Sequence, residues 1–424
     1  MRRSSNLSIG VLTLTVLMVT AASCTSDATS APTTIPVNPT VPVRRTDDGV
    51  LTIGVLIPQG SANADIGEAI RSATELAKDK INAAGGYRGQ GVVLVPEDEG
   101  VLGVGIDPAI ASLLDSNVDA IIGPASSTNA LAGLGEIIDA GVVACSPTAS
   151  ASLLDDFPDH DLFFRTIPSD SLQAIAIAEA VDNTGASGAT ISYIDDAFGQ
   201  RFADAVAAAL VAKRIEQSNA VPFSADNASI KTAAQEVAQI AAGVVVVIGD
   251  AASGPVMLGA IDAADGNRMP LFVVNDAIRR PAASAEPMSA SLARRVKGIS
   301  PIAFSTDATF LEQVGATPDN PSPFAANAFD CFNLIALAAT ASNSTQPAAI
   351  AAAIPGVSDS GSPCTNFAAC RDEILLGNNI NYDGPGGQLT INGKGELAGA
   401  LFESFGFNDA TGRDEHRGFV AVRP

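Results

Sequence analysis

Residues 120–150 read AIIGPASSTNALAGLGEIIDAGVVACSPTAS, and this stretch decides the fold class of the chain. Two short apolar runs, Ala120–Gly123 and Val142–Cys145, flank a segment with helical periodicity, which predicts a parallel strand–helix–strand unit. The loops at the carboxyl ends of parallel strands line a common crevice. We therefore expect the loops Pro124–Asn129 and Ser146–Ser150, both rich in hydroxyl groups, to lie side by side.

Hydroxyl residues mark the start of the predicted helix. Ser126, Ser127 and Thr128 are placed either to cap this helix or to present hydroxyl and backbone N–H groups to an anion. Both interpretations stay open for each residue alone. Two such loops next to each other favour a site for a carboxylate.

The composition limits the classes of partner. At 424 residues the chain is long enough for two domains with full cores. It is 47 % apolar, yet its formal net charge is −22. An acidic chain of this kind is a poor partner for nucleic acid and for anionic lipid headgroups. We therefore expect no nucleic acid binding and no membrane docking through a basic face.

The N-terminal segment is predicted to lie outside the folded domains. Residues 1–23 combine two arginines with an apolar run too short to span a bilayer, as a signal peptide does. The run Ala21–Cys24 resembles a bacterial lipobox, so Cys24 is the expected lipid-modified N-terminus. An ordinary secretory signal followed by a chance cysteine is the alternative. Residues 24–49, rich in Thr, Pro and Ser, are predicted to form an extended tether.

The remaining cysteines suggest disulfides. Cys364 and Cys370 enclose a short loop, and we expect a bridge between them because export permits disulfides. Cys145 and Cys331 are expected on a strand and a helix of one lobe, where they either pair or remain two buried thiols. No metal site is expected, because the two histidines are far apart in sequence and Cys-x-x-Cys does not occur.

Strands and helices alternate along the rest of the chain. Residues 51–145 predict a doubly wound, Rossmann-like sheet, and residues 163–276 repeat this plan. No GxGxxG opens a helix after a strand, so a dinucleotide site is not expected. The acidic run 97–99 is interpreted as a solvated loop edge. Two further strands are predicted, Gln388–Ile391 and Ala400–Phe407.

Several segments occur in order along the chain: IGVLIPQG, INAAGGYRGQ, IIGPASST, SPTAS, FFRTIPSD, IDDAFGQ and NYDGPGGQLTINGKGE. Together they resemble the type I periplasmic binding proteins, specifically the branched-chain amino acid receptors of ABC transporters. The resemblance implies an α/β fold of two Rossmann-like lobes joined by three crossovers, with a ligand cleft between them. It assigns residues 50–165 and 303–396 to lobe 1, and residues 166–302 and 397–424 to lobe 2.

The resemblance also implies a ligand site. Its residues are Ser126, Ser127, Ser146, Thr148 and Ser150 of lobe 1, and Phe198, Asp250 and Asp276 of lobe 2. Ser127 and Ser150 match positions that hold the α-carboxylate of an amino acid, and the backbone carbonyl of Thr148 matches one that receives its α-ammonium. In lobe 2, Asp276 falls where the family often has a glutamate as counter-ion of the ammonium.

The other lobe 2 positions depart from the family. Phe198 falls where the family often has tyrosine, and its ring can still cover a ligand. Asp250 or its neighbour Ala251 falls where the branched-chain group has tyrosine, which leaves the preferred ligand side chain undetermined. All three lobe 2 residues also have structural interpretations, since aspartate is a preferred helix cap and phenylalanine is usually buried. Asp276 is the most informative of them, because a buried zwitterion needs both charges compensated. A ligand without an amine would leave this carboxylate unpaired.

The resemblance implies an extracytoplasmic, lipid-anchored substrate-binding protein that captures a small amino acid, branched-chain or related, and delivers it to an ABC permease. The alternatives are a ligand-sensing receptor module of the same fold, or a carrier of an amide or small carboxylate. Catalysis is not expected, because GxSxG is missing and neither histidine has a Ser or Cys near it in sequence. We expect no cofactor, a monomer, and a location at the outer face of the cytoplasmic membrane.

Overall fold

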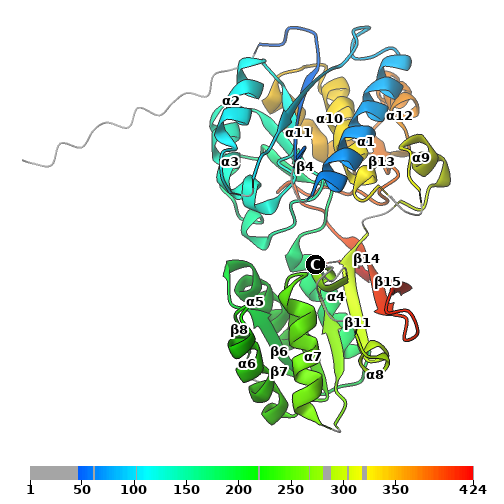
Figure 1. Cartoon of the computed structure of the whole chain (residues 1–424). Coiled ribbons are helices and arrows are strands. Elements are labelled where there is room, and N and C mark those ends of the chain that lie inside the picture. Colours follow the sequence, from blue (N-terminus) through cyan, green and yellow to red (C-terminus); the bar gives the residue numbers. More distant parts are fainter. Residues whose placement is uncertain are drawn as a thin grey trace, which may run out of the picture. The chain divides into compact units, whose positions relative to one another are not determined.

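The computed structural model describes residues 46–60, 63–101, 103–217, 220–266, 268–279, 288–302, 305–317 and 322–423 (Figure 1). The predicted signal peptide, the predicted lipidation site Cys24 and most of the predicted tether lie outside these ranges. Asp47, at the end of the predicted tether, already contacts the fold: it forms an ion pair with Arg88 at 3.0 Å and accepts a hydrogen bond from Thr345 at 3.1 Å.

The first large sheet is parallel, with the strand order β2-β1-β3-β4-β5. Its strands are β1 (Thr52–Ile57), β2 (Val93–Asp98), β3 (Ala120–Ile122), β4 (Val143–Ser146) and β5 (Phe163–Arg165). The associated helices are α1 (Ala64–Ala83), α2 (Asp107–Asp115), α3 (Ser127–Asp139), α10 (Ala325–Ser342) and α11 (Pro347–Val357), with the short η1 (Ser152–Leu154) and α9 (Ala308–Gln313). The predicted strand–helix–strand unit is therefore confirmed as β3-α3-β4.

Alternation along the strands explains why helices cover both faces of this sheet. Successive side chains of a strand point to opposite faces. Ile53 and Val55 of β1 belong to the core cluster that contains α1 and α10, whereas Leu56 belongs to the cluster formed with α2 and α3. Both faces of the sheet are thus apolar, as in most parallel sheets.

The second large sheet has the strand order β15-β14-β11-β10-β9-β6-β7, and β8 also pairs with β6. Its strands are β6 (Gly188–Ile194), β7 (Glu216–Gln217), β8 (Val221–Phe223), β9 (Val244–Ile248), β10 (Leu271–Val274), β11 (Val296–Pro301), β14 (Ala400–Phe407) and β15 (Asp414–Val422). The helical elements are α4 (Asp170–Asp182), α5 (Ala197–Ala212), α6 (Asn227–Ile240), α7 (Ser253–Asp265), η2 (Asp276–Arg279) and α8 (Ala290–Ala293).

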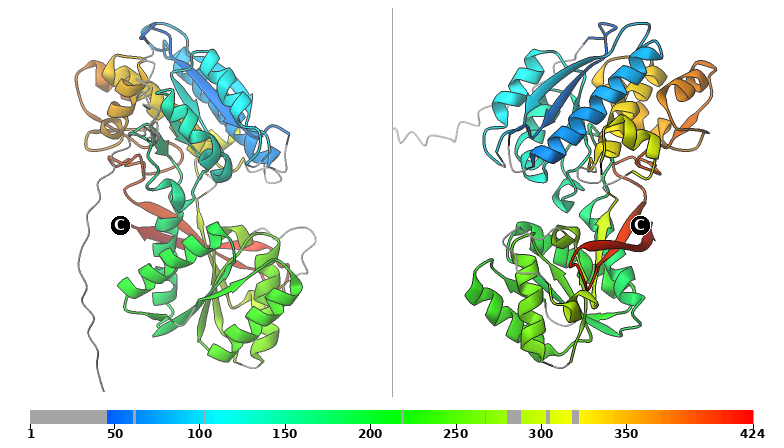
Figure 2. Two further views of the ribbon diagram at one scale, coloured as in Figure 1. Left: turned by 90° about the vertical axis from the view of Figure 1, so that its left-hand side faces the viewer. Right: turned by 45° about the vertical axis from the view of Figure 1, so that its right-hand side comes forward.

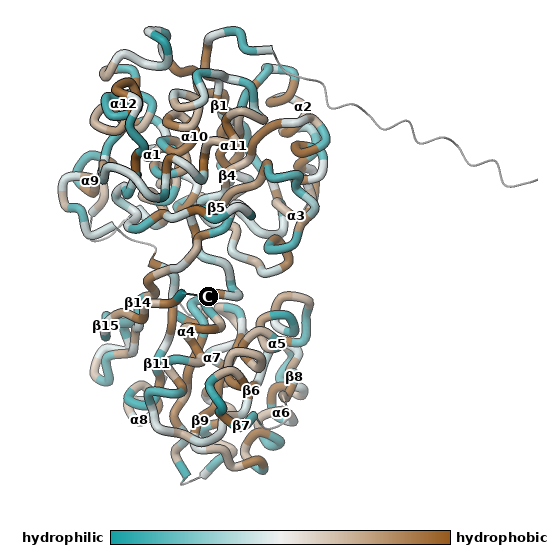
Figure 3. The backbone as a smooth tube through the Cα atoms, turned by 180° about the vertical axis from the view of Figure 1, so that it is seen from behind, coloured by the Kyte–Doolittle hydropathy of each residue, from teal (hydrophilic) through white to brown (hydrophobic). Residues whose placement is uncertain are grey.

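The core of this second part follows the same rule. Val246 of β9 packs in the cluster that contains α4 and α5, and its neighbour Val247 packs in the cluster that contains α6 and α7. Figure 3 shows the hydropathy of the backbone, with apolar colour in strands such as β9. Within the described ranges, no helix is both long enough and apolar enough to cross a membrane.

The chain passes between the two large sheets after β5, after β11 and before β14. The last passage delivers the C-terminal hairpin, in which β14 pairs antiparallel with β11 and β15 with β14 (Figure 2). The predicted strand at Ala400–Phe407 is confirmed. The one predicted at Gln388–Ile391 is wrong, because only an isolated bridge between Ile391 and Leu397 forms there. Strand β15 was not predicted.

A smaller unit covers one end of α10. It contains the parallel strands β12 (Ser362–Cys364) and β13 (Ile380–Tyr382) and the helix α12 (Phe367–Leu375). A disulfide joins Cys364 to Cys370, with an S–S distance of 2.04 Å.

The loop after β13 is fixed by a buried carboxyl group. Asp330 of α10 accepts hydrogen bonds from the Tyr382 hydroxyl at 2.8 Å and from the N–H of Gly386 at 2.9 Å. A Cβ atom at Gly384 would lie 1.8 Å from an Asp330 oxygen, so only glycine fits there. Burial raises the pKa of Asp330 to about 8, although both hydrogen bonds act in the opposite direction.

Candidate functional site

Hydroxyl groups join the two loops that were predicted to line the crevice. The Ser146 hydroxyl donates to the carbonyl of Pro124 at 2.7 Å and accepts from the N–H of Ala149 at 3.0 Å. The Thr148 hydroxyl donates to the carbonyl of Ala125 at 2.5 Å. Because Ser146 is fully buried and already bonded on both sides, its role is to shape the loop. The backbone of residues 146–150 is thereby held against the start of α3.

Ser126 and Ser127 differ in what their hydroxyl groups do. The Ser126 hydroxyl accepts from the N–H of Asn129 at 3.0 Å and so caps α3. The Ser127 hydroxyl accepts from the N–H of Ala151 at 3.1 Å and bridges the two loops. A serine hydroxyl that accepts one bond still has its own hydrogen to donate. Both hydroxyls keep a hydrogen to donate, but Ser127 is the one that contacts the end of the second loop, so it is the better placed of the two to meet an anion there.

The interpretation of residues 97–99 as a solvated edge is wrong for Glu99. Its side chain is buried and accepts from the N–H groups of Ala125 (2.7 Å) and Ser126 (3.3 Å). Burial raises the pKa of Glu99, while these hydrogen bonds oppose the rise. The donors just ahead of α3 are thus used by the protein itself, which narrows the predicted anion site to Ser127 and the second loop.

Asp170, the first residue of α4, is a buried carboxyl group that the sequence did not reveal. Only 5 % of its surface is exposed. Its N–H donates to the carbonyl of Ser150 at 2.8 Å, and its carboxyl group is hydrogen-bonded by the Ser150 side chain. Burial and the negative charge of Asp276 raise the pKa of Asp170 to about 8, against the lowering effects of Ser150 and Arg165.

Asp276 lies at the start of η2, directly after β10. Its carboxylate accepts a hydrogen bond from the Gln173 amide at 2.8 Å, and the same amide nitrogen donates to the carbonyl of Ile299 at 2.8 Å. Burial raises the pKa of Asp276, whereas Gln173 and the positive charge of Arg279 lower it. The backbone N–H of Asp276 itself also contributes a hydrogen bond that lowers the pKa of this carboxyl group.

Asp170 and Asp276 form a pair of interacting acids beside the Ser150 loop. The charge of Asp276 raises the pKa of Asp170, so the pair is electrostatically unfavourable when both are ionised. A cation placed next to the pair would remove this repulsion. The arrangement therefore favours a positively charged group, such as an ammonium, over a second anion.

The two remaining predicted residues have clear structural contacts. Phe198, near the start of α5, is 36 % exposed, and its ring packs edge-on against Phe202 with 5.7 Å between centroids. The Asp250 carboxylate accepts from the N–H groups of Ala252 (2.8 Å) and Ser253 (2.5 Å) at the start of α7. Asp250 is thus engaged as a helix cap, the structural interpretation given above.

The buried side chain of Arg165 connects the loop Ser146–Ser150 with two of the passages between the sheets. Arg165 donates to both carboxylate oxygens of Glu396 (2.9 and 3.0 Å) and to Asp155 (2.5 Å). It also donates to the carbonyls of Ala149 (3.3 Å) and Ala151 (3.1 Å). Burial raises the pKa of Glu396, and the guanidinium opposes this rise. Arg165 thereby fixes the backbone on either side of Ser150.

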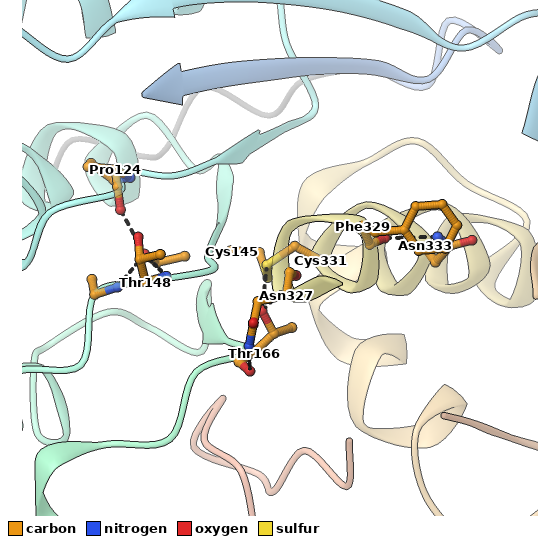
Figure 4. The surroundings of a disulfide bond; sticks show 10 residues. Pro124, Cys145, Thr148, Thr166, Asn327, Phe329, Cys331 and Asn333 are labelled. Carbon is orange, nitrogen blue, oxygen red and sulfur yellow. Dashed lines mark hydrogen bonds between the residues drawn. A yellow bond between two sulfur atoms is a disulfide. The ribbon is translucent and has the colours of Figure 1, made fainter. Parts of the chain in front are cut away.

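A disulfide anchors the same loop from the other side. Cys145, on β4, is bonded to Cys331 on α10 with an S–S distance of 1.97 Å (Figure 4). The Thr166 hydroxyl lies 3.5 Å from the Cys331 sulfur and donates to the carbonyl of Asn327 at 2.8 Å, while the Asn327 amide donates to the carbonyl of Thr166 at 2.7 Å. Of the two alternatives left by the sequence, the structure has the paired one. Within the described residues, no His, Cys, Asp and Glu side chains gather in a metal-binding group.

Two α/β units linked by several chain passages, with hydroxyl-rich loops at the strand ends, define a solute-binding protein. Comparison with known proteins agrees. Residues 50–374 match the family model described as periplasmic binding protein. The chain belongs to this family, whose members are extracytoplasmic proteins that bind small molecules.

Individual relatives differ in role and in ligand. The chain is 30 % identical over 357 residues to the chemotactic signal transduction system substrate-binding protein BasB of Halobacterium salinarum, which covers 80 % of this chain and 83 % of BasB. The fold is similar to that of LivJ from Streptococcus pneumoniae in complex with isoleucine, at 20 % identity and a TM-score of 0.63, covering 88 % of this chain and all of that one. It is also similar to a solute-binding protein from R. palustris in complex with benzoate, at 17 % identity and a TM-score of 0.61, covering 89 % and 98 %.

Proposed function

We propose that this protein is the extracytoplasmic substrate-binding lipoprotein of an ABC importer, and that it captures an α-amino acid of the branched-chain or a related type. The observation that carries the proposal is the pair Asp170 and Asp276 beside the hydroxyl-rich loop at Ser150. An amino acid carries a positive ammonium, which suits the acid pair, and a negative carboxylate, which suits the hydroxyl-rich loop. Its ammonium relieves the repulsion between the two acids, and its carboxylate takes the hydroxyl and N–H donors.

Each end of the amino acid has its proposed partners. The carboxylate is bound by the Ser127 hydroxyl and by the backbone N–H groups of Ser127 and Ser150, while the Ser150 hydroxyl donates to Asp170. The ammonium is bound by the carbonyl of Thr148 and the carboxylates of Asp170 and Asp276. Phe198 covers the ligand when the lobes close. Asp250 stays at the edge of the site as the cap of α7.

The fold alone does not choose this ligand. The same fold is found in complex with isoleucine in one protein and with benzoate in another. Benzoate has a carboxylate and no amine, so it would add negative charge near Asp170 and Asp276. In this chain the two acids argue for a ligand with an amine.

Lipid anchoring and delivery complete the proposal. Cys24 is acylated after removal of residues 1–23, and residues 24–49 connect the anchor to the folded part. Lobe 1 consists of residues 50–165 and 303–396, and lobe 2 of residues 166–302 and 397–424. The monomer delivers its ligand to the membrane subunits of a permease.

Ligand sensing is a second candidate function. The similarity to BasB, a chemotactic signal transduction system protein, favours it. Both functions need the same ligand site, but they differ in the second partner. Deletion of the gene for this protein should abolish uptake of the radiolabelled ligand under the importer proposal. Unchanged uptake with a lost behavioural response would favour sensing.

The ligand class is tested by thermal unfolding of the mature domain with each standard L-amino acid, with the corresponding amides and with short carboxylic acids. Ligand at about 100 times its Kd should add about 2.7 kcal/mol to the free energy of unfolding. The best-binding L-amino acid is then titrated by calorimetry into the parent, Asp276→Asn and Ser127→Ala proteins.

Loss of one partner of a desolvated ion pair costs about 2–5 kcal/mol, so Asp276→Asn should weaken binding about thirtyfold or more. Ser127→Ala should cost less, about 1–2 kcal/mol, because other donors still hold the carboxylate. Equal affinity of Asp276→Asn and the parent would contradict the proposal. A parent protein that prefers ligands without an amine would contradict it as well.

A further inference from the structure

Asp276 shares a single helical turn with an arginine that is bound elsewhere. The 3₁₀ turn η2 begins at Asp276 and ends at Arg279, and Ile278 between them is fully buried in the second core cluster. So short a turn has little rigidity of its own. Its orientation, and with it the direction of the Asp276 carboxylate, depends on the contacts that hold its two ends.

Arg279 is held by both strands of the C-terminal hairpin. It donates to the two carboxylate oxygens of Glu403 on β14, at 2.6 and 3.2 Å, and to Asp414 on β15 at 2.6 Å. Its guanidinium also lies 5.2 Å from the ring centroid of Phe405. The side chains of Arg279 and Glu403 are only 13 % and 12 % exposed. A bidentate, partly buried pair of this kind is stronger and more directional than an exposed one.

The contacts of Asp276 on its other side lead to the same pair of strands. Gln173 joins Asp276 to the carbonyl of Ile299 on β11. Ile299 is paired with Ser404 on β14, next to Glu403. The Asp276 turn is therefore fixed from two directions, and both end at the β11–β14 pair.

We propose that Arg279 is a positioning residue: it orients the side-chain carboxylate of Asp276 that binds the ligand. In this way the C-terminal hairpin (residues 400–422) holds part of the ligand site. This inference rests on the proposed function, because it takes Asp276 as the partner of an ammonium. Arg279 does not touch the ligand. It fixes the turn, and its positive charge acts against the effect of burial, which raises the pKa of Asp276.

The simpler role for Arg279 is a clamp that only attaches the hairpin to the fold. The chain offers a matched control for this role. Arg294, after α8, donates at 2.8 Å to Asp409 in the turn of the same hairpin, and its side chain is 62 % exposed. Arg294→Gln removes a cation that is paired with the hairpin, at a position outside η2. Arg279→Gln removes a cation that is paired with the hairpin and also the contact that holds the turn of Asp276.

The experiment compares Arg279→Gln, Arg279→Lys, Arg294→Gln and Asp276→Asn in the full mature domain. The probe is the best-binding L-amino acid of the thermal panel, titrated by calorimetry well below every unfolding temperature. We expect Arg279→Gln to weaken binding about tenfold, within the range for residues that act through others. Arg279→Lys should recover part of this loss, and Arg294→Gln should bind like the parent.

The pH profile separates positioning from simple attachment. The charged groups around Asp276 and Arg279 are Asp170 on α4, Glu403 and Asp414 of the hairpin, and His416, whose ring nitrogen lies 3.1 Å from Glu403. Without Arg279 the pKa of Asp276 rises, so the loss of affinity on acidification should begin at a higher pH in Arg279→Gln than in the parent. A profile that is weaker at every pH but not displaced would contradict the inference.

The outcomes distinguish this inference from the proposed function. If Asp276→Asn loses affinity and Arg279→Gln does not, the positioning role is wrong and the amino-acid function stands. If Asp276→Asn binds as tightly as the parent, the proposed function is wrong. If Arg294→Gln weakens binding as much as Arg279→Gln, the effect comes from general attachment of the hairpin and the inference fails.

Discussion

Asp170→Asn gives the sharpest test of the electrostatics of the site. In the folded protein Asp170 is buried beside Asp276, and its pKa is raised to about 8 from an ordinary value of 3.8. Asparagine keeps the size of the side chain and can still accept the hydrogen bond from Ser150. It removes only the ability to ionise.

The sign of the effect on stability follows from proton binding. A carboxyl group whose pKa is raised on folding holds its proton more tightly in the folded state, so its contribution to stability is lost as the pH rises through about 8. The loss approaches about 1.4 kcal/mol per pH unit between the two pKa values. Over about three units, from about pH 5 to 8, the free energy of unfolding of Asp170→Asn should therefore rise by about 4 kcal/mol relative to the parent.

The same substitution should change what happens when the amino acid binds. The ammonium favours the ionised form of Asp170, so binding near neutral pH expels its proton. In calorimetry, the observed heat then depends on the ionisation enthalpy of the buffer. We expect proton release by the parent and almost none by Asp170→Asn, which should also bind more weakly because one partner of the ammonium is lost.

The assay combines denaturant unfolding at several pH values with titrations in two buffers. Asp330→Asn is the control, because Asp330 is a second buried acid with a pKa of about 8, but Tyr382 and Gly386 hold it in another part of the chain. Its variant should release the same proton as the parent on binding. Stability profiles of Asp170→Asn and the parent that run parallel with pH would refute the reasoning, as would undiminished proton release by Asp170→Asn.

Two predictions concern the cysteines. Replacing both Cys364 and Cys370 by serine should lower the free energy of unfolding by about 2–3 kcal/mol, because the unfolded chain regains the entropy of the open loop. Denaturant titration measures this change. Alkylation of both thiols in the native oxidised protein would rule out the bridge. Cys24→Ala should move the protein from the membrane fraction to the soluble fraction, because one or more acyl chains provide the attachment; a variant that sediments with membranes would place the anchor elsewhere.

The sequence predicts the sheets because buried parallel strands have a strong local signature. Runs such as Val244–Ile248 are apolar throughout, since both faces of the sheet are covered. The hairpin was predicted only in part. Strand β15, DEHRGFVAV, carries charges at the edge of its sheet and shows little regular alternation. The segment at Gln388–Ile391 has the residues of a strand, but its backbone is engaged elsewhere: the Leu389 N–H donates to Asp383.

The contact between the two hydroxyl-rich loops could be predicted from the sequence, but the buried acids that contact these loops could not. Glu99 and Asp170 look in sequence like ordinary acids at a strand end and at a helix start, where acids are common. What sets them apart is burial and a contact with a distant segment: Glu99 with the backbone at Ala125, and Asp170 with Ser150 and the charge of Asp276. Those contacts depend on how the sheets and passages come together, which no local pattern encodes.

Burying Asp170 next to Asp276 lowers the stability of the protein, and the proposed ligand gives a reason for it. In the unliganded protein, Asp170 either keeps its proton or, when ionised, repels Asp276. Burial of either form costs free energy of folding. An ammonium beside the pair favours the ionised form of both acids, although Asp170 must first release its proton. A carboxylate without an amine offers no such compensation and adds a further negative charge. Under the proposed function, the same pair that lowers the stability of the empty protein would therefore favour amino acids over simple acids.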